Sequence, residues 1–446
     1  MSHSDISRRN FVGDIVAAGA AFSIVPRHVI GGRGFRAPSD TLNVVCVGVG
    51  GMGQSDVRGM SDQNLVAFAD VDWRSADKTF QTYPTVKRYK DWREMFDKEQ
   101  KNFDAVTVST PDHAHTAVAM AALKLGKHVY VQKPLARTLG EVRALKAEAA
   151  KRPKQSTIMG NQGHAAEGMR LIREWVESGA IGNVKEVHCW TDRPIWPQGK
   201  NRPSEAHNVP PTMDWNLWIG PAADRPYHPS YAPFNWRGWW DFGTGAMGDM
   251  ACHMMDAAFW ALELKYPTRI SAESTPLFVE TAPLASRITY EFPGTGKRGP
   301  ITLVWRDGNI TPPRPFDWPD SRPWPFDTSA QYWVGDKGTL TAGTYAENPR
   351  LTDETTHKAL MANPLPQKYP RTRGVYGEWV DAIKAGTQPG SNIAGHAGQL
   401  TEIIALGNLA VRMGRTLELN AETGAITNVT VPADFITPTY RPGWSY

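Results

Sequence analysis

A glycine-rich segment directly after the first apolar run restricts the fold of this 446-residue chain more than any other feature. The run at 42–48 has the length of a strand, and Gly48-Val49-Gly50-Gly51-Met52-Gly53 fits the pattern G-x-G-x-x-G. Glycines at these places permit a tight turn, close approach of the backbone to a pyrophosphate, and close packing of the next helix on the strand. The segment predicts a Rossmann-type turn that binds a dinucleotide.

An acidic residue follows at the distance that this turn requires. Asp70 ends the next apolar run, twenty residues past Gly50. A carboxylate there can accept hydrogen bonds from ribose hydroxyls and would repel a 2′-phosphate, so NAD is favoured over NADP. Asp72 or Arg74 could alter that balance. A glycine turn without a ligand is the alternative, but the strand, the helix and the acid all match the fingerprint.

Apolar runs of strand length alternate with segments of helical period up to residue 160. This alternation predicts βα units around a doubly wound parallel sheet. The expected strands are 42–48, 65–70, 105–110, 128–131 and 157–160, and the expected helices are 74–83, 91–99, 114–125 and 139–149.

The pattern changes after residue 160 to the order of an α+β domain with a large, mostly antiparallel sheet. We expect helices at 167–177, from about Gly248, at 375–385 and at 398–413, and β segments at 184–191, 287–292, 301–306 and 331–341. The fold class is therefore α/β, with a signal and linker at 1–39, a Rossmann domain at 40–160 and a substrate-binding domain at 161–446.

The charge and cysteine content exclude several classes of protein. The net charge of +4 is small, and no stripe of Lys and Arg accompanies it, so we expect no nucleic-acid partner. Cys46, Cys189 and Cys252 are too few for a disulfide framework and lack paired metal-ligand spacing. They are expected to be small buried side chains.

The N-terminal segment is typical of a twin-arginine export signal. Ser7-Arg8-Arg9-Asn10-Phe11-Val12 precedes an Ala- and Gly-rich apolar run at 15–25 that is too short to span a membrane. We therefore expect the twin-arginine machinery as a partner and a periplasmic or exported location. Asp14 interrupts the run, cleavage stays open, and an ordinary basic arm is the alternative.

Further motifs follow in a distinctive order. They are Thr110-Pro111-Asp112-His113-Ala114-His115, Gly126-Lys127-His128-Val129, Gln132-Lys133-Pro134-Leu135-Ala136 and Gly243-Thr244-Gly245-Ala246-Met247-Gly248-Asp249-Met250-Ala251-Cys252-His253. With the glycine segment, these motifs resemble those of the Gfo/Idh/MocA oxidoreductases, of glucose–fructose oxidoreductase and inositol dehydrogenase type. The resemblance covers about 40–420.

The resemblance implies Lys133, Asp249 and His253 as catalytic residues of a hydride-transfer enzyme. Asp249 and His253 are four residues apart, so a helix places them on one face. A carboxylate beside the imidazole would fix its tautomer and support its charged form, which suits His253 to take a hydroxyl proton. Lys133 would polarise the reacting oxygen.

The resemblance also implies cofactor contacts from Thr110, Pro111, His115, Gln132 and Lys133. Gln132 departs from the family, which usually has Glu there. Its amide can still bond a ribose or nicotinamide group, but a charge beside Lys133 is lost. A metal site made of Asp249, Cys252 and His253 is the alternative. Ligand-type residues alone rarely establish such a site, so we expect no bound metal.

Substrate contacts are expected from the second domain. Trp190, Trp196, Trp215, Trp218, Trp236, Trp239 and Trp240 lie close together in the sequence with polar neighbours. Aromatic faces with polar neighbours suit sugar rings, although core packing should claim several of these side chains. We expect Arg193, Trp236, Trp240 and His164 to line the site, His164 being otherwise a core or helix-start residue. A homo-oligomer formed through the second sheet is also expected.

Export of a folded protein to a compartment without a ready NAD pool favours a tightly bound, recycled cofactor. The favoured function is hydride transfer on a sugar, polyol or glycoside, which includes oxidation of one sugar coupled to reduction of another. A redox-neutral NAD-dependent glycoside hydrolase or lyase, a dehydrogenase with exchanging NAD, and a non-catalytic NAD-binding protein are the alternatives.

Overall fold

A six-stranded parallel sheet forms the first half of the computed structural model, which describes residues 41–446 except residue 327. Its strands, in the order β3-β2-β1-β4-β5-β6, are all parallel to their neighbours. The order reverses between β1 and β4, which confirms the predicted doubly wound sheet and places its ligand crevice beyond the carboxyl ends of these strands. The strands are β1 (Asn43–Val47), β2 (Asn64–Ala69), β3 (Lys87–Tyr89), β4 (Ala105–Val108), β5 (His128–Val131) and β6 (Thr157–Met159).

Three helices of this half begin at polar caps, one follows the glycine turn, and one begins after Pro111. Asp72 and Asp91 each accept a backbone N–H two residues on, and Thr138 forms a capping box with Glu141. The four predicted helices are confirmed to within two residues, whereas the short, polar β3 was not predicted. The helices are α3 (Gly53–Gly59), α4 (Trp73–Thr82), α5 (Trp92–Glu99), α6 (Asp112–Lys124) and α7 (Leu139–Ala150).

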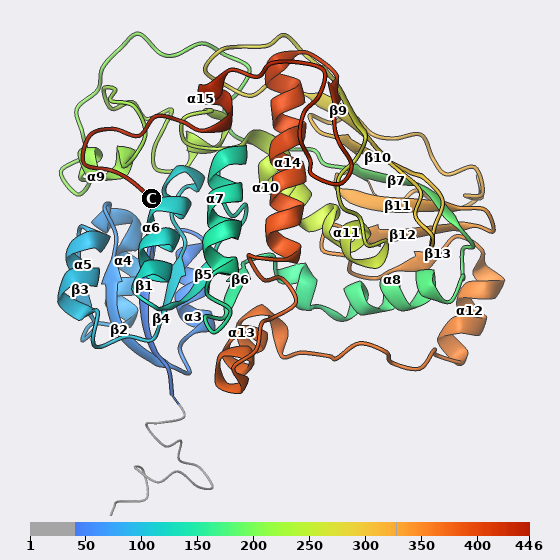
Figure 1. The fold of residues 1–446 in the computed structure, drawn as a ribbon, viewed down its shortest axis with the longest axis horizontal. Coiled ribbons are helices and arrows are strands. Elements are labelled where there is room, and N and C mark those ends of the chain that lie inside the picture. Colours follow the sequence, from blue (N-terminus) through green and yellow to red (C-terminus); the bar gives the residue numbers. More distant parts are fainter. Residues whose placement is uncertain (1–40, 327) are drawn as a thin grey trace, which may run out of the picture. The chain divides into compact units, whose positions relative to one another are not determined.

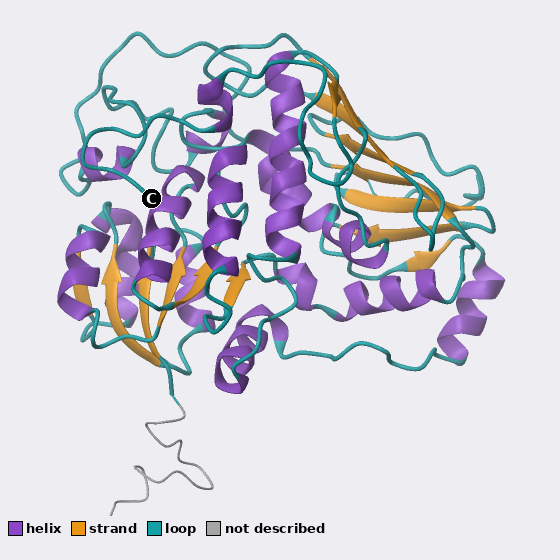
Figure 2. Cartoon of the chain, in the orientation of Figure 1, coloured by secondary structure: helices purple, strands orange, loops and turns teal. Residues whose placement is uncertain are grey.

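An eight-stranded sheet forms the second half, as the right of Figure 2 shows. Its order is β13-β12-β11-β7-β10-β9-β8-β14, and every neighbouring pair is antiparallel except β7 and β10, which confirms the mostly antiparallel prediction. The strands are β7 (Val184–Trp190), β8 (Arg269–Ser274), β9 (Ser286–Phe292), β10 (Ile301–Arg306), β11 (Ala330–Gly335), β12 (Thr339–Gly343), β13 (Arg350–Leu351) and β14 (Leu417–Glu418).

The predicted strand at 331–341 is wrong as a single element. The turn 336–338 divides it into β11 and β12, which pair with each other as a hairpin. Gly338 there has φ +156, a backbone conformation that favours glycine. The strands β8, β13 and β14 were also not predicted.

Helices pack between the two sheets (Figure 1). α10 packs on β7, while α14 packs on α10, on β8 and on α7 of the first half. None of the helices between residues 41 and 446 is long and apolar enough to cross a membrane. The remaining helices are η2 (Gln162–Ala165), α8 (Glu167–Glu177), α9 (Trp215–Ile219), η3 (Asn235–Gly238), α10 (Gly245–Met254), α11 (Asp256–Ala261), α12 (Glu354–Ala362), α13 (Gly374–Ala385), α14 (His396–Met413) and α15 (Ala433–Ile436).

Residues from both halves of the chain form one compact unit, Asn43–Tyr446. The last residues of the expected second domain return to the first: α15 packs on α7, and the Tyr440 hydroxyl donates to Glu141 Oε1 at 2.6 Å. The predicted export signal at 1–39 lies outside the described residues.

A buried carboxylate joins α7 to α14. Glu402 accepts from Arg143 Nε at 2.7 Å, Lys146 Nζ at 2.5 Å and the Tyr266 hydroxyl at 3.0 Å. Burial opposes ionisation, but the hydrogen bonds from Lys146 and Arg143 outweigh it and hold the pKa of Glu402 below its usual value. Glu402 therefore stabilises the junction in its charged form.

We expect Glu402→Gln to lower the free energy of unfolding by about 2 kcal/mol at pH 7, less than for a fully buried pair because Arg143 is partly exposed. Because the folded-state pKa of Glu402 is lowered, its contribution is present above the unfolded value and is lost as pH falls, so the difference should shrink below about pH 4.5. Urea unfolding followed by tryptophan fluorescence checks both points.

Glu94→Gln is the matched control, because its partner Lys98 and Glu94 itself are both exposed. We expect this change to cost less than about 0.5 kcal/mol. Equal effects of the two substitutions would show that Glu402 does not stabilise the junction.

Candidate active site

The glycine turn is closed on its inner side and open on its outer side. Gly48 has φ +76, and a Cβ there would lie 2.6 Å from the Ser109 carbonyl oxygen, so only glycine fits against β4. Gly51 has φ +50, and a Cβ there would meet nothing within 4 Å. The turn therefore presents bare backbone outward, which is the surface that a pyrophosphate requires.

Asp70 lies directly after β2 and holds this turn. Its Oδ2 accepts from the backbone N–H groups of Val49 at 2.9 Å and Gly50 at 3.1 Å, and its Oδ1 accepts from Asp72 N–H at 2.9 Å. Burial raises the pKa of Asp70, and these three donors act against the increase. The carboxylate lies beside the turn as expected, and its contact with a ribose stays a prediction.

The turn after β4 carries a hydroxyl without a partner. Thr110 Oγ1 is buried and has no hydrogen-bond partner in the described part of the chain, and Pro111 caps α6 next to it. The two ring nitrogens of His115 each lie 2.8 Å from a backbone carbonyl oxygen, one of Thr110 and one of Pro134. His115, expected at the cofactor, instead ties this turn to the Lys133–Pro134 bond, which is cis.

Lys133, Asp249 and His253 come together at the carboxyl edge of the parallel sheet. Lys133 follows β5, while α10 carries both Asp249 and His253. Lys133 Nζ donates to Asp249 Oδ1 and to the Asp249 carbonyl, both at 2.7 Å. The structure therefore brings Lys133 into contact with Asp249, and His253 lies one turn along α10, close enough for the Lys133 charge to act on it.

Arg237 is a member of this cluster that sequence reasoning did not identify. Its Nε lies 3.1 Å from Asp249 Oδ1, and its guanidinium also donates to the buried Asp112 at 3.3 Å. The guanidinium stacks over the Trp236 ring at 4.2 Å. Its sequence signals are its place among the polar neighbours of the tryptophans in the aromatic loop and its position shortly before the glycine-rich start of α10.

The charges around Asp249 correct one expectation. Burial would raise the pKa of Asp249, but Arg237 and Lys133 outweigh burial and hold this pKa well below its usual value. Both cations contact the carboxylate, and no hydrogen bond joins Asp249 to the His253 ring among the described residues, so the expected control of the tautomer is not seen. The Asp249 charge does raise the pKa of His253, as expected, but burial and the Lys133 charge outweigh it.

His253 is a buried, neutral imidazole. Its side chain is almost inaccessible, and burial together with the Lys133 charge lowers its pKa to about 3. Its Nδ1 is buried and lacks a hydrogen-bond partner within residues 41–446 as described. The ring meets Tyr345 edge-on at 4.7 Å between centroids. His253 is therefore unprotonated at neutral pH, which is the state that a general base requires.

Gln132 faces a buried carboxylate that sequence reasoning also missed. Its Nε2 donates to both oxygens of Asp56 at 3.0 Å, while its Oε1 accepts from the backbone N–H of Lys133 at 3.3 Å. Asp56 accepts further hydrogen bonds from Ser109, Tyr130 and Tyr376. The amide group expected at the cofactor thus links Asp56 to Lys133.

The four expected substrate residues separate into two groups, of which His164 and Trp240 are buried. Arg193 and Trp236 keep part of their surface exposed, although Arg193 pairs with Asp192. Trp240 is buried, and the Arg412 guanidinium lies 5.1 Å from its ring. Many aromatic side chains of this loop are packed in a hydrophobic core, as expected. One packed cluster comprises Met213, Trp218, Ile219, Ala222, Tyr227, Tyr231, Ala232, Trp239 and Phe242.

The structure bears on the alternative metal site as well. Cys252 is buried, which raises the pKa of its thiol, and two cations already contact Asp249. These contacts disfavour a cation held by Asp249, Cys252 and His253. Cys46 and Cys189 are likewise buried free thiols, as predicted.

We expect Gln132→Glu to destabilise the protein increasingly as pH rises from 5 to 8. It places a second carboxylate about 3 Å from Asp56, so one of the two must keep its proton in the folded state. A folded-state pKa above the unfolded value contributes stability at low pH that is lost at high pH. Thermal unfolding at several pH values measures the effect.

The double variant Asp56→Asn, Gln132→Glu exchanges the amide and the carboxylate, and it should remove the added pH dependence. If both variants lose the same stability at every pH, the proposed pairing of Gln132 with Asp56 is wrong.

Two family models match the chain. The Gfo/Idh/MocA oxidoreductase model for the NAD-binding Rossmann fold matches residues 42–160, and the model for the C-terminal alpha/beta domain matches 168–297.

Curated relatives match over a limited region. A levoglucosan dehydrogenase of Pseudarthrobacter phenanthrenivorans is 28% identical over 168 residues, which are 38% of this chain and 35% of that protein. An inositol 2-dehydrogenase of Burkholderia multivorans is 30% identical over 155 residues, which are 33% of this chain and 45% of that protein. The match thus spans less than half of each relative.

Solved structures share the fold over most of the chain. The WlbA dehydrogenase from Bordetella pertussis, in complex with NADH and UDP-GlcNAcA, has a TM-score of 0.59 at 15% identity, with 85% of this chain and 99% of that one covered. Levoglucosan dehydrogenase with NADH and levoglucosan has a TM-score of 0.56 at 17% identity, with 85% and 99% covered. Since the two family models together match more than half of its residues, the chain belongs to the Gfo/Idh/MocA family of oxidoreductases.

Proposed function

We propose that this protein oxidises a hydroxyl group of a sugar, polyol or glycoside, with NAD as the hydride acceptor. The observation that carries the proposal is the convergence of Lys133, Asp249 and a neutral His253 at the carboxyl edge of the parallel sheet. The relatives support the substrate class, because levoglucosan and inositol are both polyhydroxylated rings. A protein that only binds NAD would need none of these three side chains.

The residues around the glycine turn fit NAD. The backbone at Gly51 is open to a ligand, and the buried Thr110 hydroxyl lacks a hydrogen-bond partner among the described residues. A carboxylate offers about four acceptor positions, and backbone N–H groups take three at Asp70. One position is left for a ribose hydroxyl, as the preference for NAD over NADP requires.

Each catalytic residue has one task in the proposed step. NAD, when bound, would take the hydride from the carbon that bears the reacting hydroxyl. His253 accepts the proton of that hydroxyl, so a carbonyl forms and the imidazole becomes charged. Lys133 donates a hydrogen bond to the reacting oxygen, and Asp249 with Arg237 holds Lys133 in place.

The twin-arginine motif at residues 7–12 supports an extended proposal. An exported enzyme has no ready supply of NAD, so we infer that the cofactor is retained and recycled on the protein. The reaction then ends either in reduction of a second sugar or in a redox-neutral cleavage of a glycoside. A homo-oligomer formed through the eight-stranded sheet belongs to the same proposal.

We expect Lys133→Met and His253→Ala each to reduce turnover about 10²- to 10⁴-fold, because each removes a group that acts on the reacting hydroxyl. The cofactor should stay bound, since the glycine turn is unchanged. A panel of sugars and glycosides without added NAD, with mass spectrometry of the released cofactor, measures both quantities.

Lys98→Met is the control, because Lys98 lies exposed on α5. Turnover of either site variant at the level of this control would contradict the assigned roles. Release of stoichiometric NADH, dependent on added NAD, would instead contradict recycling and leave an ordinary dehydrogenase.

We expect kcat/KM to show no decrease as the pH is lowered from 8 to 5. The free enzyme loses its base only when His253 becomes protonated, and the lowered pKa places that event near pH 3. A kcat/KM profile with a stable substrate checks this. An acid limb with an apparent pKa near 6.5 that disappears in His253→Ala would contradict a neutral, desolvated imidazole.

A further inference from the structure

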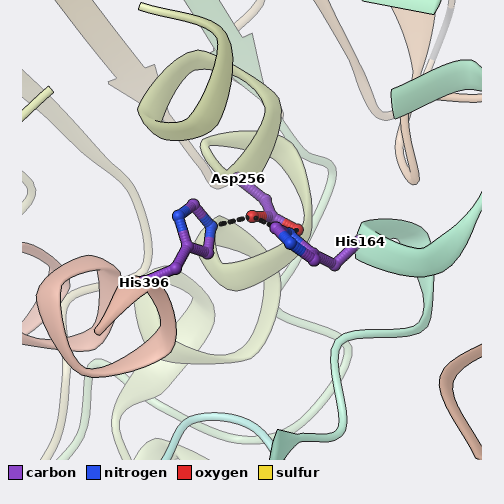
Figure 3. A group of neighbouring side chains, drawn as sticks. All are labelled: His164, Asp256 and His396. Atoms are coloured by element: carbon purple, nitrogen blue, oxygen red, sulfur yellow. Dashed lines mark hydrogen bonds and ion pairs between the residues drawn. The ribbon is translucent and has the colours of Figure 1, made fainter. Parts of the chain in front are cut away.

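A second buried cluster contains three side chains of the kind that bind metal ions, and Figure 3 shows them facing one another: His164, Asp256 and His396. His164 Nδ1 lies 3.0 Å and His396 Nε2 lies 2.5 Å from Asp256 Oδ1. The cluster does not include Lys133 or Asp249. His164, expected to contact substrate, therefore lies with two partners that its sequence position did not indicate.

The spacing of the three ligand atoms suits a single ion. All three lie within 4.8 Å of one another. Tetrahedral nitrogen and oxygen ligands stand about 2.1 Å from Zn²⁺, and hence about 3.4 Å from each other. Small side-chain rotations would bring the observed separations to this value. Two imidazoles and one carboxylate are also a donor set that first-row transition ions prefer.

The surroundings of the cluster match the outer contacts of a metal site. Asn161 Nδ2 donates to Asp256 Oδ2 at 2.7 Å, which leaves Oδ1 for the ion. A Cβ built on Gly390 would lie 2.8 Å from His164 Nε2 and 3.2 Å from Glu378 Oε1, so both groups face this glycine. Metal-bound histidines usually donate their second N–H to such a carboxylate.

Glu378 supplies an independent indication. Its Oε2 is buried and has no hydrogen-bond partner among the residues that the structure describes. The nearby Arg170 guanidinium donates to the carbonyls of His164 and Pro370, and forms no ion pair with Glu378 or Asp256 among the described residues. With the charge of Arg170 counted, the two carboxylates leave one net negative charge facing a cation at this place.

We propose that His164, Asp256 and His396 bind one divalent transition ion of the Zn²⁺ type, with Glu378 accepting the second N–H of His164. Three protein ligands leave a fourth position for water. The ligands lie in η2, at the first residue of α11 and at the first residue of α14. The ion would therefore cross-link η2, at the start of the second domain, to the first residues of α11 and α14.

The test is metal content of the full chain, purified without affinity tag or chelator after equilibration with ZnCl₂ and gel filtration. We expect one zinc per chain by mass spectrometry of the metal, and a raised melting temperature that a chelator reverses. Substitution of Co²⁺ should give the visible absorption of a four-coordinate site. Neither readout depends on turnover, so failure here is distinct from failure of the proposed oxidoreductase activity.

Two variants keep the proposal falsifiable even where one fails to fold. His396→Ala should lose the ion, and Glu378→Gln, which keeps all three ligands, should bind it about 10- to 100-fold more weakly in competition with a chelator. His207→Ala removes an exposed histidine outside the cluster and should change nothing. The proposal would be overturned if the wild-type protein held no zinc. It would also be overturned if His396→Ala and Glu378→Gln both bound zinc as tightly as the wild type.

Discussion

The buried carboxylate of Asp249 is the group on which the arrangement of the site depends. An isolated charge at this depth would cost several kcal/mol, so Asp249 requires its two cations. One, Lys133, follows a strand of the parallel sheet, and the other, Arg237, comes from the aromatic loop of the second half. This ion cluster therefore determines how the sheet edge, the loop and α10 meet.

The same cluster explains the state of His253. The Lys133 charge and the burial that the cluster creates both disfavour an imidazolium, so the ring stays neutral. Helical spacing alone suggested that Asp249 serves His253. In the structure the carboxylate contacts Lys133 and Arg237, two long cationic side chains from other segments. Desolvation and the neighbouring cation thus lower the proton affinity of the ring and keep it unprotonated.

Local spacing predicted much of the molecule. The glycine turn and the parallel sheet follow from motifs whose members lie close in sequence or end adjacent strands, whereas the grouping of Lys133 with Asp249, 116 positions away, came from the family resemblance. Contacts between distant segments could not be predicted in this way. Tyr376 donates to Asp56 across 320 positions, and His396 reaches Asp256 across 140. Short polar strands such as β3 likewise form because of their neighbours and not because of their own residues.

The most direct test of the account is a double-mutant cycle on kcat/KM with Lys133→Met, Asp249→Asn and the pair combined. If Asp249 acts by holding Lys133, Asp249→Asn should reduce kcat/KM strongly in the wild type and hardly at all once Lys133 is Met, because their effects share one interaction. Additive losses, together with a full effect of Asp249→Asn that vanishes only in His253→Ala, would show that the carboxylate serves the imidazole and would contradict the account.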